Sequence, residues 1–181
     1  MNFRNWGVRL AEQRSRTWPA DPASWAEPEA TWYRGVTVNA PACVVFRWLC
    51  QIRVAPYSYD WIDNFARQSP RRLLSGLDQL EIGQSVMTIF RVSDFSADRY
   101  LTIHLSSPLG LLCRDLSITY LCLPHGVEQT RLLVRIGVLY PKNLFGPITR
   151  LLLPAGDLVM MRKQLLTLKR LSEQSRRQNH L

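Results

Sequence analysis

Residues 145–175 carry the apolar spacing of one long helix, and this helix constrains the fold more than any other part of the chain. Leu158, Met161, Leu165 and Leu168 recur every three or four residues, and the small residue Ser172 continues this spacing. Such a stripe must be buried, because a helix draws most of its stability in water from packing. Pro154 removes a helical hydrogen bond, so we expect it to kink or split this helix. A split gives a short turn near 147–153 and a main helix from about residue 156.

Four strand-like runs precede this helix and supply the apolar surface that it needs. The runs are 85–92, 99–106, 115–123 and 127–139. Apolar and polar residues alternate in the second run, and apolar and basic residues alternate in the fourth. This alternation is typical of an antiparallel sheet with one face toward water. The links between the runs are short, which favours hairpins over the long crossovers of parallel strands.

One strand and two short helices come before these runs. Residues 31–39 are rich in β-branched and aromatic side chains, as strands are. Pro41 suits the first turn of a helix that Pro56 ends, and a second helix is predicted from about Ser58 to Arg67. The order predicts an α+β fold in which a curved antiparallel sheet wraps around the long C-terminal helix. A sheet twisted in this way leaves an apolar space, which is a natural ligand cavity.

The 181 residues suit a single domain with two short extensions. We place the domain at 31–175, between an arm at 1–30 that is rich in aromatic residues and proline and a basic tail at 176–181. The arm contains Trp6, Trp18 and Trp25. Disordered segments are poor in aromatic residues, so we expect the arm to pack on the domain or on a partner.

The net charge of +9 is concentrated toward the two ends of the chain. Arginines in residues 1–16 and basic residues in 162–181 supply most of the excess. A nucleic-acid binder would carry its charge on a folded face among aromatic side chains, so no specific nucleic-acid partner is expected. Solvated ends explain the pattern, and a weak contact with an anionic membrane or RNA is the alternative.

The cysteines and histidines show no metal-binding pattern. Cys43, Cys50, Cys113 and Cys122 form no C-x-x-C pair, and the three histidines are far apart. We therefore expect reduced cysteines that pack as small apolar side chains, and no metal or cofactor. The chain has neither a membrane-spanning apolar run nor a signal-peptide pattern, so a cytoplasmic location is expected.

Several motifs along the chain match a known superfamily. They are Val38–Pro41 with Trp48–Gln51, the block Tyr57–Asn64, Leu80–Gln84, and Gly156–Leu165. Over about residues 31–174 the chain resembles the START-like superfamily, also called SRPBCC or polyketide-cyclase and lipid-transfer proteins. The resemblance implies the helix-grip fold, with a cavity for hydrophobic small molecules between sheet and C-terminal helix, and only some branches are enzymes. The block Tyr57–Asn64 and the segment Asp157–Arg162 resemble one bacterial branch of the superfamily, whose members are largely uncharacterised. The chain departs from that branch at Gln84, where an acid is common, and at 53–56.

The candidate ligand-binding residues come from four predicted elements. They are Gln51; Tyr57, Tyr59, Trp61 and Asn64; Ile103; and Leu158, Met161 and Leu165. The second group is interpreted either as a polar patch at one end of the cavity or as capping and packing residues. Asp157 suits an ion pair with an arginine at the helix start better than acid–base work. His104 is predicted on the polar outer face of its strand.

The sequence therefore favours binding over catalysis, and three functions remain open. No spacing joins residues into a catalytic triad, a phosphate loop or a metal cluster. Uptake of a lipid or polyketide-like molecule is the first hypothesis. A polyketide cyclase or dehydratase is the second, and it requires a titratable group such as Tyr59, Asp60 or His104 inside the pocket. An interaction protein that uses the arm and the basic tail is the third.

Overall fold

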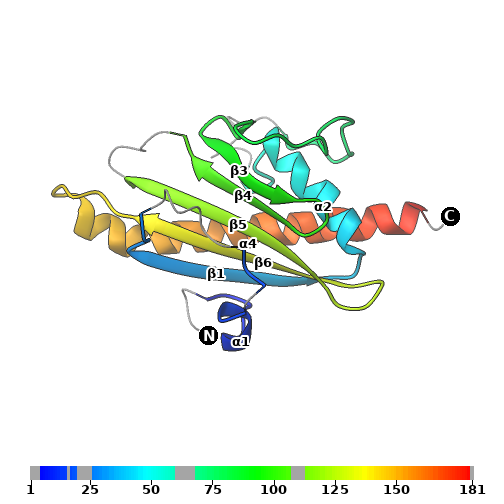
Figure 1. The fold of residues 1–181 in the computed structure, drawn as a ribbon, viewed down its shortest axis with the longest axis horizontal. Helices are drawn as coiled ribbons and strands as arrows, with labels where there is room; N and C mark the ends of the chain where they lie inside the picture. Colours follow the sequence, from blue (N-terminus) through cyan, green and yellow to red (C-terminus); the bar gives the residue numbers. More distant parts are fainter. Residues whose placement is uncertain (1–4, 16, 20–25, 60–67, 107–112, 180–181) are drawn as a thin grey trace.

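The computed structural model describes residues 5–15, 17–19, 26–59, 68–106 and 113–179. In these residues a six-stranded antiparallel sheet lies against one long helix (Figure 1). The elements follow in the order α1 (Leu10–Gln13), β1 (Ala30–Val38), α2 (Ala42–Cys50), η1 (Gln51–Arg53), β2 (Ser85–Val86), β3 (Phe90–Ser96), β4 (Tyr100–Leu105), β5 (Asp115–Pro124), β6 (Thr130–Leu139) and α4 (Gly146–Asn179). This order confirms the predicted α+β helix-grip fold.

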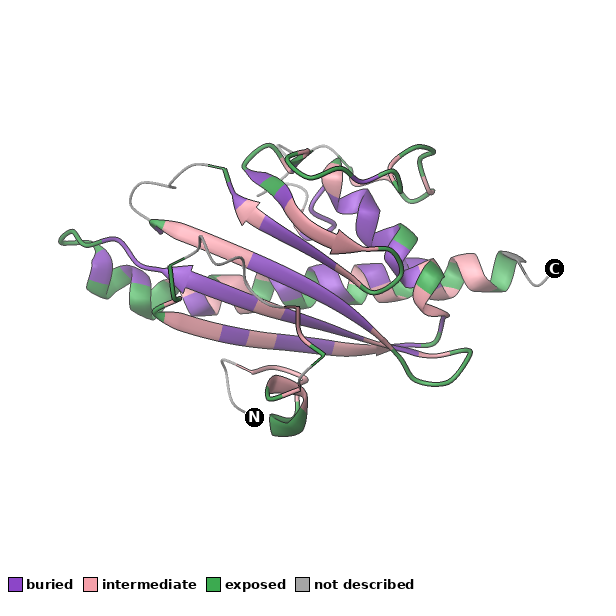
Figure 2. Ribbon diagram, in the orientation of Figure 1, coloured by how far each residue is buried: buried purple, intermediate pink, exposed green. Residues whose placement is uncertain are grey.

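The strands from β2 to β6 form a meander, and β1 closes the far side of the sheet. The spatial order is β1-β6-β5-β4-β3-β2, with each neighbouring pair antiparallel. α4 runs along one face of this sheet, behind it in the view of Figure 1. Buried and exposed residues alternate along α4 (Figure 2). The predicted inner residues Met161, Leu165 and Leu168 are buried, whereas Leu158 is half-buried.

The predicted strand at 85–92 is wrong, because a turn divides it. β2 ends at Val86 and β3 begins at Phe90, and both Met87 and Thr88 have positive φ angles, of 48° and 69°. The amide N–H of Gly83 donates to the carbonyl of Val92 at 2.7 Å, which fixes the hairpin. A short apolar run has no periodicity that distinguishes one strand from two, so the pattern did not reveal the turn.

The predicted break at Pro154 is also wrong, because α4 continues through this residue. Proline removes one helical hydrogen bond, and contacts in the preceding turns hold the helix here. The hydroxyl of Thr149 donates to the carbonyl of Gly146 at 2.9 Å. Arg150 forms an ion pair with Glu29 and lies 4.5 Å from the ring centroid of Tyr140.

The N-terminal arm covers part of the outer face of the sheet. Arg131 of β6 donates to Glu12 of α1 at 2.8 Å. Arg135, also on β6, lies 5.5 Å from the ring centroid of Trp18. A Cβ at Gly35 of β1 would lie 2.9 Å from the side chain of Val8, so the arm packs closely here. The basic face of β6, expected to meet water, is therefore half-buried under the arm.

Candidate functional site

The concave face of the sheet presents its side chains in rows, because paired residues of neighbouring strands point to the same side. The first row contains Phe90 paired with Leu105, and Leu116 paired with Val138. The second row contains Val92, Ile103, Ile118, Ile136 and Trp32. The third row contains Leu101, Tyr120, Val134 and Arg34.

The three rows follow one another along the direction of α4. Arg150 pairs with Glu29 just before β1, Asp157 with Arg34 inside β1, and Lys169 with the carbonyl of Thr37 near its end. β1 and α4 therefore run side by side in the same direction. The first row lies toward the start of α4, and the third row lies deeper along it.

Burial increases from the first row to the third. Phe90 keeps 6% of its surface exposed and Leu105 keeps 5%, and Leu116 is half-buried. In the second row Ile118 keeps 6%, whereas Leu101 and the rest of the third row are fully buried. α4 shows the same trend, from half-buried Leu153 and Leu158 to fully buried Leu165. The third row, which meets α4 at Asp157 and Gln164, is therefore closed. Several side chains of the first two rows, although not Val138, keep some exposed surface.

The polar side chains of this interior lie at the third row. Arg34 Nη2 donates to Asp157 Oδ2 at 2.6 Å and joins β1 to α4. The hydroxyl of Tyr120 donates to Gln164 Oε1 at 2.8 Å, and Gln164 Nε2 donates to the carbonyl of Pro56 at 2.7 Å. Polar groups thus join β1, β5 and the backbone at Pro56 to α4 inside an apolar interface.

Burial shifts the pKa values of these groups toward their neutral forms. Burial raises the pKa of Asp157 from 3.8 to about 6, although the Arg34 guanidinium acts in the opposite direction. Burial lowers the pKa of Arg34 despite the attraction of Asp157. Burial also raises the pKa of Tyr120. The cost of removing these charges from water therefore exceeds the attraction within the pair, and Asp157 titrates close to neutral pH.

Three of the predicted ligand-binding residues belong to the buried core between sheet and helix. They are Ile103 of the second row and Met161 and Leu165 of α4, whereas Leu158 is half-buried on the same helix. The predicted helix from Ser58 to Arg67 falls largely on residues outside the described ranges, and so do Trp61 and Asn64, two further predicted site residues.

The other three predicted residues lie away from this contact. Gln51 bonds the backbone of Leu74, accepting from its amide at 2.9 Å and donating to its carbonyl at 3.3 Å. Tyr57 is buried edge-to-face against Trp48, with ring centroids 6.2 Å apart. Tyr59 is half-buried, with the ammonium group of Lys163 5.8 Å from its ring centroid.

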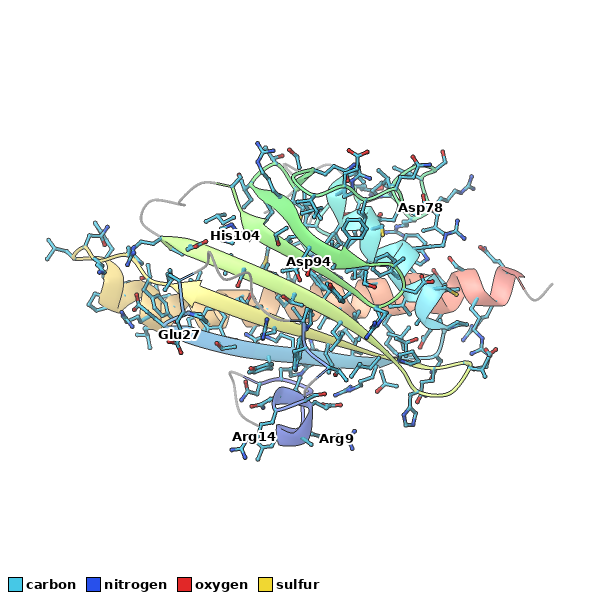
Figure 3. All side chains as sticks on the ribbon, viewed as in Figure 1. Arg9, Arg14, Glu27, Asp78, Asp94 and His104 are labelled. Carbon is cyan, nitrogen blue, oxygen red and sulfur yellow. The ribbon has the colours of Figure 1, made fainter. Side chains whose placement is uncertain are left out.

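Two predictions about titratable residues are confirmed. His104 Nε2 lies 2.7 Å from Asp115 Oδ1, and its side chain lies on the face of the sheet opposite α4, between inward-pointing Ile103 and Leu105 (Figure 3). Asp157 forms the expected arginine ion pair, although within α4 rather than at its start. Arg34 was not predicted as the partner. Arg34 alternates with Trp32, Val36 and Val38, so the strand pattern already placed a charged side chain among inward-facing apolar residues.

Neither a metal site nor a membrane-spanning helix occurs among the described residues. Within the described ranges, no group of three or more His, Cys, Asp or Glu side chains is placed to hold a metal ion. Among the same residues, no helix combines the length and the apolar character that a membrane crossing requires.

Comparison with known proteins supports the fold. No protein-family model matches the chain, and no curated protein sequence does. Among solved structures, it is similar to the Zhui aromatase/cyclase from Streptomyces sp. R1128, with 15% identity, a TM-score of 0.53, and coverage of 80% of this chain and 93% of that chain. It is also similar to the protein TTHA0849 from Thermus thermophilus, with 13% identity, a TM-score of 0.51, and coverage of 81% of this chain and 99% of that chain.

A third similar structure comes from Thermobifida fusca, with 12% identity, a TM-score of 0.52, and coverage of 77% of this chain and 90% of that chain. Identities this low establish a shared architecture and nothing more specific. Together with the sheet order and the position of α4, they show that the chain has the helix-grip fold.

Proposed function

We propose that this protein binds an apolar small molecule between the concave face of the sheet and the first half of α4. The proposal depends on apolar side chains of four elements that keep a small exposed fraction inside an otherwise closed contact. They are Phe90 of β3, Leu105 of β4, Ile118 of β5 and Met161 of α4, each at 5–6%. Apolar lining with a few polar groups at one end is typical of small-molecule sites.

The polar groups indicate what the ligand carries besides its apolar body. The indole Nε1–H of Trp32 in the second row is buried and has no hydrogen-bond partner in the described part of the chain. A buried donor without a partner is costly, and a ligand oxygen would satisfy it. The ligand class is therefore a lipid or polyketide-like molecule with at least one oxygen acceptor near Trp32 and Arg34.

A larger side chain at Met161 tests this proposal. We expect protein purified from an extract to carry an apolar species in native mass spectrometry, and Met161→Trp to lose it because the indole fills the space. The matched control is Leu166→Trp, which makes the same addition on the exposed side of the same helix and should keep the species. Equal occupancy of both variants, or a wild-type protein that never carries an apolar species, would contradict the proposal.

A cyclase-type enzyme is the second candidate, and Asp157 favours it. A carboxyl group with a pKa of about 6 is available as both acid and base near neutral pH, which proton-transfer catalysis requires. The similar Streptomyces structure is named an aromatase/cyclase. His104 lies on the outer face and is no longer a candidate for this role.

A substitution at Asp157 separates the two candidates. An enzyme that uses this carboxyl should accumulate substrate in Asp157→Asn, so extracts would load the variant and the wild type with species of different mass. A carrier should hold the same species in both proteins. Identical species at equal occupancy would therefore rule out catalysis by Asp157.

A further inference from the structure

The first half of α4 carries an apolar stripe on the side that faces away from the sheet. The exposed fraction of its side chains ranges from 48% at Phe145 to 93% at Leu144, and both of these residues lie just before the helix. The stripe comprises Leu144, Phe145, Ile148, Leu151, Leu152 and Val159. Within α4, Ile148, Leu152 and Val159 are separated by four and seven residues, so they share one helical face. We refer to these six residues as the outer stripe. A contiguous exposed apolar surface of this kind marks an interaction site.

The surroundings of the outer stripe are basic. Between Glu128 and Glu173 the chain contains a single acidic residue, Asp157, which pairs inward with Arg34. Lys142 lies just before the stripe, and Lys163 and Arg170 continue the exposed side of α4 beyond it. The outer side of α4 therefore combines apolar and cationic side chains, and the helix itself contributes no carboxylate there before Glu173. From outside the helix, Glu29 reaches α4 and pairs with Arg150.

A basic groove adjoins the same side of α4. It has a volume of about 130 Å³, and Arg71, Lys163 and Arg170 line it together with the hydroxyl groups of Ser58 and Thr167. Among the described residues that line the groove, none is acidic. The three cationic side chains suit a phosphate group. Both hydroxyl groups already donate within the protein, Ser58 to Met160 Sδ and Thr167 to the carbonyl of Lys163.

We propose that the outer side of α4 docks on an anionic lipid bilayer. The outer stripe enters the interface between headgroups and acyl chains, and Lys142, Lys163 and Arg170 contact lipid phosphates, as in amphipathic helices that lie on membranes. A second copy of the chain is a poorer occupant, because two such faces would bring their cations together. This proposal is independent of the ligand proposed above, since it uses the opposite side of the helix.

Vesicle co-sedimentation tests the docking surface. We expect the protein to bind vesicles of phosphatidylcholine with phosphatidylglycerol, and to bind vesicles of phosphatidylcholine alone about tenfold or more weakly. Ile148→Glu/Leu152→Glu should reduce binding to the anionic vesicles about tenfold or more, because carboxylates do not enter the interface. The control is Ile82→Glu/Val127→Glu, which makes the same charge change at two exposed apolar residues elsewhere and should bind at least several-fold more tightly than the stripe variant.

Each other outcome overturns the proposal. Equal binding to both vesicle types would show that anionic lipid is not required. Equal loss of binding in both variants would show that the change in net charge, and not the outer stripe, explains the effect. A wild-type dimer in analytical ultracentrifugation that only the stripe variant dissociates would assign the surface to a second copy. Unchanged thermal unfolding of the variants would exclude misfolding, and the Met161→Trp result bears on ligand binding alone.

Discussion

Replacing the buried ion pair by apolar side chains, in the variant Arg34→Met/Asp157→Leu, is expected to raise the free energy of unfolding by about 1–4 kcal/mol at about pH 7. Arg34 is fully buried and the Asp157 side chain is only 16% exposed. The pKa of each group shifts toward its neutral form, so desolvation outweighs their mutual attraction. Denaturant unfolding of both proteins at the same pH measures the difference.

The single variant Arg34→Met should behave in the opposite way. At about pH 8 it leaves an ionised carboxylate without its guanidinium partner, and we expect a loss of about 3–5 kcal/mol. At about pH 5 the Asp157 carboxyl, whose pKa is then even higher than in the wild type, is protonated, so the loss should be much smaller. A loss that is the same at both pH values would show that the arginine acts through packing alone.

The wild-type pH profile provides a second check on the pair. The folded-state pKa of Asp157 is about 6 against an ordinary 3.8, so the folded protein holds this proton more tightly than the unfolded chain does. Stability should therefore fall as the pH rises from about 4 to about 6, by up to about 3 kcal/mol. The lowered pKa values of Glu12 and Glu173 act in the opposite direction, with stability lost as the pH falls. Subtraction of the double-variant profile isolates the contribution of Asp157.

An ion pair that costs stability bears on function. Strained or costly groups persist mainly where a site requires them, and shifted pKa values cluster at such sites. Arg34 and Asp157 lie at the polar third row, at the deep end of the proposed ligand site. If the double variant is more stable and also loses the bound species, the pair serves recognition rather than folding.

The sequence predicted the parts of the fold that local periodicity determines. The strands β4 to β6 and the inner stripe of α4 follow from alternation and from three-four spacing, because one face of each element is buried. The turn at Met87 and the continuation through Pro154 involve contacts with distant residues. The amide of Met87 donates to the carbonyl of Arg53 at 3.2 Å, and Arg150 pairs with Glu29. Such contacts leave no periodic signal in the chain.

The site was predictable only in part, for a similar reason. Ile103, Met161 and Leu165 lie on faces that their own elements define. The pairing of Arg34 with Asp157 joins residues 123 positions apart, and the bond from Tyr120 to Gln164 spans 44. Partners this distant are set by the register of the sheet on α4, which a single sequence does not specify.

Truncation of Leu165, a fully buried residue near the centre of α4, should also change the free energy of unfolding strongly. Leu165→Ala is expected to lower the free energy of unfolding by about 2–5 kcal/mol, because the side chain leaves a cavity in a closed contact. Leu166→Ala makes the same change one residue away, at a side chain that is 37% exposed, and should cost about 0.5 kcal/mol or less. Denaturant unfolding of the two variants compares the inner and outer sides of the helix directly.

Met161→Ala extends this comparison to the proposed ligand site. Met161 lies one turn before Leu165 and keeps 6% of its surface exposed. Where a space already exists beside a side chain, truncation creates little new cavity, so we expect a loss of about 2 kcal/mol or less. The measurement requires protein whose native mass spectrum shows no bound species, because a ligand would stabilise the folded state. A loss as large as that of Leu165→Ala would mean that the sheet packs as closely on the first half of α4 as on the second, and the proposed site would then have no room for a ligand.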